Sequence, residues 1–169
     1  MSLIKDGRIV ADPWRHVDDE APLPATGGII VSLARWQAER SALIARRAPL
    51  GVRLSSADRA EDIAGDLDRF DVIALEFPAF KDGRAYSTAR LLRQRYQYAG
   101  ELRAVGEVLR DQLPLMARCG FDAFEYVGKT AAEEALEAFA EIDVVYQAAA
   151  DRRPHAAALR AGRPSSPQT

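Results

Sequence analysis

The stretch that decides the fold runs from residue 77 to residue 124 and reads FPAFKDGRAYSTARLLRQRYQYAGELRAVGEVLRDQLPLMARCGFDAF. It contains a segment with the apolar spacing of a helix, residues 85–99, followed by a short apolar run with the length of a strand, residues 102–106. Its charged residues gather where predicted strands end and predicted helices begin. Because α/β folds place binding groups at such points, we expect any functional site along this stretch.

Directly before the stretch, residues 71–77 (DVIALEF) are nearly all apolar, as in a strand that is covered on both faces. We predict that this is the central strand. Further strands are expected at residues 29–31, 50–54 and 121–127, with a last one at 144–146. Capping residues and apolar periodicity predict helices at about 32–48 (N-cap Ser32), 58–70 (Asp58), 85–99 (ended by Gly100), 111–119 (Asp111, ended by Gly120) and 130–141 (capping box Thr130 and Glu133).

The amino terminus predicts a small β-hairpin, because Asp6-Gly7 lies between two short apolar runs and this pair accepts the positive φ angles of a tight turn. The chain thus reads as a hairpin followed by about five β-α units, which predicts an α/β fold with a mainly parallel sheet. An open doubly wound sheet and a curled half-barrel both fit this order. We favour the open sheet, because a half-barrel leaves edges that a homodimer partner or the hairpin must cover.

The domain organisation follows from composition. We expect one α/β domain, because 169 residues suffice for a single core and fall short of a complete eightfold barrel of about 250 residues. The predicted parts are a hairpin and anchor (1–17, with Trp14 as the anchor), a linker rich in Pro and Gly (18–28), the α/β domain (29–150) and a mobile tail (151–169).

Charge and hydropathy exclude several classes of protein. A net charge of -2 gives no basic excess, so nucleic-acid binding is not favoured. We expect no membrane association, because no apolar run approaches the roughly 20 residues that span a bilayer. The amino terminus lacks the pattern of a signal peptide, and we expect a cytoplasmic protein.

The loop after the central strand is the first candidate site. Lys81 and Arg84 lie near the start of the next helix, where free amides and positive side chains can bind a small anion or phosphate. The alternative is a plain turn in which Asp82 caps the helix and Gly83 supplies an unusual φ angle. The turn is the commoner use of such a sequence.

Carboxylates form the second candidate. Glu76, Glu107 and Asp111 lie at neighbouring strand ends, as an acid-base pair or a metal site requires, although neither histidine of the chain is close in sequence. A structural network with the nearby arginines is the favoured alternative. Together with the Arg-rich helix surface, which can dock an acidic protein partner, the candidate anion- or partner-binding residues are Lys81, Asp82, Arg84, Arg90, Arg103, Glu107, Arg110 and Asp111.

Cofactor motifs are not found in the sequence. No GxGxxG or GxxxxGK[ST] motif occurs, and we expect neither a nucleotide cofactor nor a metal. The single cysteine, Cys119, rules out an internal disulfide or a four-thiolate cluster within this chain. Its place at a helix carboxyl end favours a small buried residue over a nucleophile.

Two blocks, FPAFKDGRAYSTARLLR (77–93) and ELRAVGEVLRDQLPLMARCGFDAFE (101–125), carry a resemblance to a known family. Over roughly residues 28–127 the chain closely resembles a bacterial family of unknown molecular function. Its members are commonly encoded beside genes of assimilatory sulfate and sulfite reduction and are often described as probable oxidoreductases of sulfite reduction. The resemblance implies a pathway but supplies no catalytic residues.

Two hypotheses follow. Sulfite reductases use sirohaem and a cysteine-ligated cluster, so a chain with one cysteine cannot be the reductase by itself. The first hypothesis is an accessory protein that docks to sulfite reductase or its electron donor through the Arg-rich face. The second is a small-molecule enzyme or anion sensor whose site lies at the carboxyl ends of the strands. Convergence of the candidate side chains in one concave pocket favours the second hypothesis, and a spread-out arrangement favours the first.

Overall fold

The computed structural model describes residues 2–128 and 130–139. Within them, one sheet of eight strands has the order β2-β1-β8-β7-β6-β5-β4-β3. Strands β3 to β8 run parallel to their neighbours, whereas β1 is antiparallel to β8 and to β2. The strands are β1 (Ser2–Lys5), β2 (Arg8–Val10), β3 (Trp14–His16), β4 (Gly28–Ser32), β5 (Leu50–Leu54), β6 (Val72–Phe77), β7 (Glu101–Gly106) and β8 (Ala123–Tyr126).

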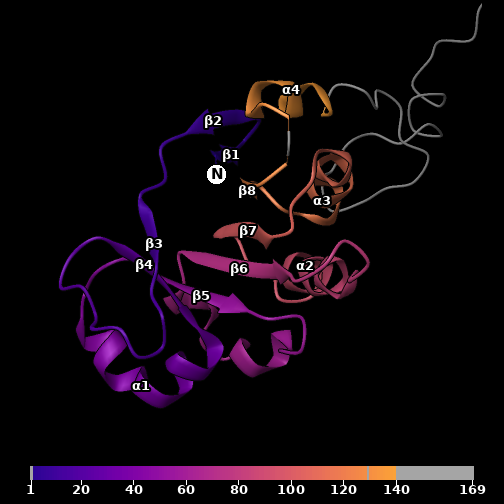
Figure 1. Ribbon diagram of the computed structural model, residues 1–169. Coiled ribbons are helices and arrows are strands. Elements are labelled where there is room, and N and C mark those ends of the chain that lie inside the picture. Colours follow the sequence, from indigo (N-terminus) through magenta and orange to yellow (C-terminus); the bar gives the residue numbers. More distant parts are fainter. Residues whose placement is uncertain (1, 129, 140–169) are drawn as a thin grey trace, which may run out of the picture.

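Helical segments follow each of the strands β4 to β8, which gives the five predicted β-α units (Figure 1). Asp6 and Gly7, with φ angles of 49° and 71°, form the predicted hairpin turn between β1 and β2. The α-helices are α1 (Leu33–Ala45), α2 (Arg84–Gln94), α3 (Leu113–Cys119) and α4 (Ala132–Glu137), and the 3-10 helices are η1 (Ala60–Ile63), η2 (Leu67–Arg69) and η3 (Arg110–Gln112). The prediction of an α/β fold with a parallel sheet and an amino-terminal hairpin is confirmed.

The sheet is open and strongly curled, so that it forms a half-barrel (Figure 1). Strand β3 lies at one edge, and β8 is third from the other edge. Even so, Nε2 of His16 on β3 lies 2.7 Å from Oε1 of Glu125 on β8. A contact between strands so far apart in the sheet order requires the sheet to bend round on itself.

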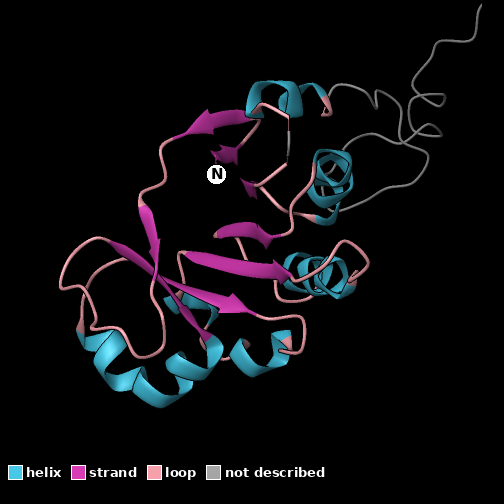
Figure 2. Cartoon of the chain, viewed as in Figure 1, coloured by secondary structure: helices cyan, strands magenta, loops and turns pink. Residues whose placement is uncertain are grey.

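The helices of the described residues lie on the outer face of this half-barrel (Figure 2). Side chains alternate between the two faces of a strand, so Ile73, Leu75 and Phe77 of β6 pack with the helices in the main core. Their neighbours Val72 and Ala74 point to the inner face, where a small second core also contains Ile30, Val105 and Trp14. The one-sided cover excludes the doubly wound version of the fold. Trp14 is partly buried and packs against this second core.

One helix prediction is corrected. Residues 58–70 do not form one long helix but the two 3-10 helices η1 and η2, which are separated around Gly65. The buried residues Ala60 and Ile63 are three positions apart, a spacing that fits a 3-10 turn as well as an α-helix. The side chain of Asp58 accepts a hydrogen bond from the amide of Ser55, and so caps a turn before η1.

The structure confirms some of the predicted helix ends and not others. Ser32 caps α1 by accepting a hydrogen bond from the amide of Arg35, and Gly120 ends α3 with a φ angle of 108°. Helix α2 instead ends at Gln94, before the predicted glycine cap. Thr130 does not form the predicted capping box, because its hydroxyl bonds to that of Tyr126 and helix α4 begins after Ala131.

Some predictions fall outside the described residues, namely the end of the last helix beyond residue 139, the strand at 144–146 and the tail at 151–169. Among the helices of residues 2–128 and 130–139, none is both long and apolar enough to cross a membrane.

Candidate functional site

The carboxyl ends of strands β5 to β8 and the loops that follow them hold most of the predicted site residues. We call this region the C-terminal edge. In the loop between β6 and α2, the guanidinium of Arg84 binds both carboxylate oxygens of Asp82, at 3.0 and 2.6 Å. It also donates to the hydroxyl of Ser56 in the loop after β5, at 2.8 Å. Arg84 therefore connects two neighbouring loops of this edge.

The same loop is a capped turn. Oδ1 of Asp82 accepts a hydrogen bond from the amide of Arg84, as the turn interpretation predicts. Gly83 has a φ angle of -93°, so it supplies no unusual backbone conformation. Hydrogen bonds from Arg84 lower the pKa of the Asp82 carboxyl well below its usual range. An anion that binds Arg84 would have to compete with this carboxylate.

Glu107 fixes the loop from the other side. It follows Gly106, whose φ angle of 90° turns the chain at the end of β7. Its carboxylate accepts a hydrogen bond from the amide of Phe80, at 2.5 Å, and its own amide donates to the carbonyl of Phe77, at 2.8 Å. These contacts fix the backbone at Phe80, which is itself 56% exposed.

The remaining predicted residues of the edge are spread over its surface. Nε of Arg110 donates to the carbonyl of Glu134, at 3.3 Å, and Asp111 is exposed in η3. Arg90 is exposed on α2, opposite the buried side chains of Ala89 and Leu92. Lys81 is exposed beside Phe80. The predicted residues therefore do not converge on a single point.

Apolar side chains on the same edge were missed from the sequence. Phe80, Leu115 and Val127 are 56%, 53% and 46% exposed, the highest values among the large hydrophobic side chains of the described residues. They follow the ends of the neighbouring strands β6, β7 and β8 respectively. The amide of Val127 also donates to the carbonyl of Val108, which joins the ends of β8 and β7. Apolar spacing alone gave no signal for them, because each follows an apolar strand or belongs to an amphipathic helix.

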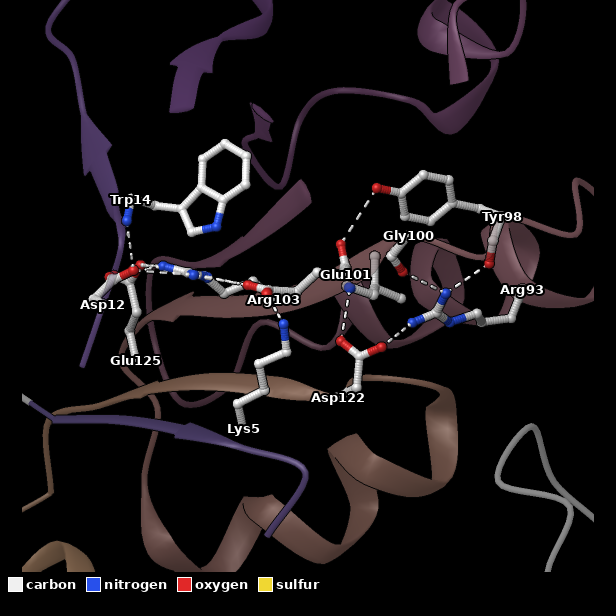
Figure 3. A network of polar contacts seen from close by, with 11 residues as sticks. Lys5, Asp12, Trp14, Arg93, Tyr98, Gly100, Glu101, Arg103, Asp122 and Glu125 are labelled. Carbon is white, nitrogen blue, oxygen red and sulfur yellow. Dashed lines mark hydrogen bonds and ion pairs between the residues drawn. The ribbon is translucent and has the colours of Figure 1, made fainter. Parts of the chain in front are cut away.

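Arg103 lies away from this edge and belongs instead to a structural network with carboxylates, the alternative that the sequence favoured. Residues 102 and 104 of β7 point to the main core, so Arg103 points to the inner face, where it is fully buried. Its guanidinium binds Glu101 at 2.7 Å, Asp12 at 2.8 and 3.2 Å, and Glu125 at 3.0 Å (Figure 3). The five donors of a guanidinium allow one side chain to join three carboxylates.

Arg103 is the centre of what we call the inner network. Lys5 on β1 binds Glu101 at 2.7 Å, and His16 on β3 binds Glu125, also at 2.7 Å. Because Asp12 precedes β3, this network ties the β3 edge of the sheet to β1, β7 and β8. It thus holds the half-barrel in its curl.

The pKa shifts in the inner network agree with its paired charges. Burial acts to raise the pKa of Glu125, but the hydrogen bonds and charges of His16 and Arg103 outweigh it and hold that pKa below its usual value. The bond to Glu101 raises the pKa of Lys5. Both shifts favour the charged forms, as a buried ion-pair network needs.

A second network explains the early end of helix α2. Arg93 donates to the carbonyls of Tyr98, Gly100 and Gly120, at 2.6, 2.8 and 2.9 Å, and binds Asp122 at 2.7 Å (Figure 3). Asp122 in turn accepts from the amide of Leu102 at 2.8 Å. Arg93 therefore connects the loop after α2 to the loop before β8.

Metal and thiol chemistry receive no support from the described residues. Among them, no group of three or more His, Cys, Asp or Glu side chains is arranged to hold a metal ion. Cys119 is buried at the end of α3, as predicted.

Comparison with known families places the chain among bacterial proteins. Residues 51–156 match the model of the family described as bacterial protein of unknown function (DUF934). The chain belongs to this family. No curated protein matches the chain.

The part that matches the DUF934 model begins in β5, so it contains the C-terminal edge with Phe80, Arg84 and Leu115. It also contains Arg103 and Glu125 of the inner network. The partners Lys5, Asp12 and His16 precede the matched residues.

Proposed function

We propose that the protein is an accessory factor of assimilatory sulfite reduction, which docks to sulfite reductase or its electron donor and has no redox centre of its own. The observation that supports docking best is the exposure of three large apolar side chains, Phe80, Leu115 and Val127, which follow the ends of the neighbouring strands β6, β7 and β8. Exposed apolar side chains that form a patch are typical of protein interaction sites. The sulfite pathway comes from the family resemblance.

The surroundings of Phe80 suit a protein partner. Its loop is fixed on both sides, by Glu107 and by the bonds of Arg84 to Asp82 and Ser56. A fixed loop loses little conformational entropy when a partner binds it. Phe80 therefore presents a rigid aromatic group beside the positive charge of Lys81, whereas the guanidinium of Arg84 is bonded to Asp82. Aromatic residues and arginine are the side chains that most often dominate the energy of interfaces.

The partner that matches this edge has an apolar pocket with carboxylates at its rim. Phe80 would fill the pocket, and Lys81 would face the carboxylates. Such charge pairing raises association rates and makes binding sensitive to salt.

Catalysis or anion binding at the C-terminal edge is less well supported than docking. The charged groups that the sequence singled out for catalysis or anion binding are spread over the edge or already bonded within the protein. Asp82 occupies the guanidinium of Arg84, and Glu107 accepts from the amide of Phe80. The spread-out arrangement is the one expected for docking.

Growth on defined sulfur sources tests the proposal. A strain that lacks the gene should fail on sulfate and on sulfite and should grow on sulfide or cysteine, and the wild-type gene should restore growth. We expect Phe80→Ser combined with Arg84→Glu to restore growth poorly, although the protein remains folded. Arg15→Gln changes an exposed arginine of β3, away from this edge, and serves as the control. Normal growth of the deletion strain on all four sources would contradict the proposal.

A further inference from the structure

A surface hollow lies at the opposite end of the sheet from the C-terminal edge. Its volume is about 250 Å³. Pro49, Leu50 and Asp71 line it, and they lie at or just before the starts of strands β5 and β6. Leu43 and Ile44, from the last turns of helix α1, form another part of its lining. The hollow is therefore separate from the proposed docking surface.

Two exposed arginines line this hollow. Arg47 follows helix α1 and makes no hydrogen bond or ion pair with the other residues that the structure describes. Arg69 lies at the end of η2, and its ion pair with Asp68 is 3.7 Å long, beyond hydrogen-bond distance. Asp71 is the one carboxylate of the lining, and its Oδ2 accepts a hydrogen bond from the amide of Leu50 at 3.1 Å. The hollow thus presents two guanidiniums with donors open to a ligand, against one carboxylate.

The backbone at Arg47 is unusual. Its φ angle is 49°, in the left-handed region, and it directly follows Arg46, the last capping residue of α1. Helices commonly end with a residue in this conformation, and that residue is usually glycine, because most side chains are strained there. The arginine side chain therefore needs a reason of its own. Its charge beside the end of the helix dipole is one reason, and the hollow that it lines is a second.

Hydrogen bonds fix the walls of the hollow. Arg46 donates to the carbonyl of Pro49 at 3.1 Å and to that of Pro24 at 2.6 Å, so the chain after α1 is held in place. The amide of Asp71 donates to the carbonyl of Leu50 at 2.8 Å, in addition to the bond that its carboxylate accepts. A site that is already ordered loses little conformational entropy when a ligand binds.

The apolar lining and the volume define the rest of the ligand. Leu43, Ile44 and Pro49 give the hollow an apolar wall, and Ile44 is 38% exposed, so apolar surface is open to contact. A water molecule occupies about 30 Å³, so the hollow has room for roughly eight groups of that size. It suits a small molecule that has both a charged head and an apolar body.

We propose that this hollow binds a small organic anion with an apolar body, of the size of a medium-chain carboxylate. The anionic head accepts hydrogen bonds from Arg47 and Arg69, since charge-assisted bonds to guanidinium groups are strong. The apolar body covers Leu43, Ile44 and Pro49. This inference does not depend on docking, because its residues lie at the other end of the strands.

Titration of the full chain with hexanoate, followed by the NMR signals of its backbone amides, tests the site. We expect saturable shifts with a Kd of about 1 mM or below, largest for residues 43–50 and 69–71. Acetate has the carboxylate without the apolar chain, and hexanol has the chain without the charge, so each should bind about 10-fold or more weakly. Equal binding of acetate would show a plain anion site, and equal binding of hexanol a plain apolar site. Either result would overturn the proposal.

Variants then locate the binding. Arg47→Gly removes the guanidinium and suits the left-handed backbone, so it should remain folded by circular dichroism and bind hexanoate about 10-fold or more weakly. Arg69→Gln should weaken binding to a similar extent. Arg15→Gln should bind as the wild type does, because Arg15 is exposed on β3 and does not line the hollow. Lack of saturable shifts with hexanoate, or binding that Arg47→Gly and Arg69→Gln both retain, would overturn the proposal.

Discussion

Removal of the Arg103 side chain should strongly destabilise the protein. The variant Arg103→Ala takes a fully buried guanidinium from between three carboxylates, Glu101, Asp12 and Glu125. Two of these carboxylates, Glu101 and Glu125, have side chains that are only 7% and 6% exposed. Their charges would remain buried with one partner fewer each.

The expected loss is large. Breaking a buried ion pair by removing one partner costs about 3 to 5 kcal/mol, a substantial part of the 5 to 15 kcal/mol that stabilises a typical domain. For a chain of this size, about 2 to 4 °C of melting temperature is lost per kcal/mol. We therefore expect the melting temperature to fall by about 6 to 20 °C.

Urea unfolding followed by circular dichroism measures this loss, with Arg90→Ala on the exposed side of α2 as the matched control. The loss should become smaller as the pH is lowered toward 4, because the stranded carboxylates can then take up protons. The double variant Arg103→Met with Glu125→Gln should lose less than the sum of the single changes, because it removes a charge from each side. If Arg103→Ala and Arg90→Ala cost the same, within about 0.5 kcal/mol, the inner network does not hold the curl as argued.

Two further substitutions test the arguments on the pKa of Glu125 and on the backbone conformation at Gly106. Glu125 has a folded pKa below its ordinary 4.5, so the stability that it contributes is present above this pH and is lost as the pH falls through the folded pKa. Glu125→Gln should therefore flatten the pH dependence of unfolding between about pH 5 and 3, and an unchanged slope would contradict the assignment. Gly106→Ala should cost about 2 kcal/mol or more, because φ is 90° and the new Cβ would lie 2.5 Å from the carbonyl oxygen of Phe77. Gly65→Ala, which meets nothing within 4 Å, is the control, and equal losses in urea unfolding would refute the steric argument.

Local chemistry made much of the fold predictable. The Asp6-Gly7 turn, the Ser32 cap and the Gly120 ending each depend on one or two residues, so the sequence shows them directly. The apolar run at residues 71–77 likewise predicted the central strand β6. Curl was harder to predict, because it depends on contacts of His16 with Glu125 and of Asp12 with Arg103, which are 109 and 91 residues apart.

The position of the candidate site in the fold was predictable, but the placement of its individual residues was not. The rule that sites follow the carboxyl ends of parallel strands located the loop of Lys81, Asp82 and Arg84 correctly at the C-terminal edge. It could not show that Arg103 faces inward, because the face of a strand residue is known only once the register and the covered side are known. In β7, Arg103 lies between the buried apolar residues Leu102 and Ala104. Because side chains alternate along a strand, this pattern was the signal that Arg103 faces the other side of the sheet from them.

The exposure of Phe80 was also hard to predict, because the position of its loop depends on a distant contact, the bond from its amide to Glu107.

Direct binding to the enzymes of sulfite reduction tests the central claim. The purified full chain would be titrated, in calorimetry, with the sulfite reductase holoenzyme and with its electron donor from the same bacterium. The account predicts saturable binding to one of them that weakens as salt is raised and that Phe80→Ser weakens about 10-fold or more, whereas Arg15→Gln leaves it unchanged. Lack of binding to both proteins at low salt, or binding that Phe80→Ser does not affect, would contradict it.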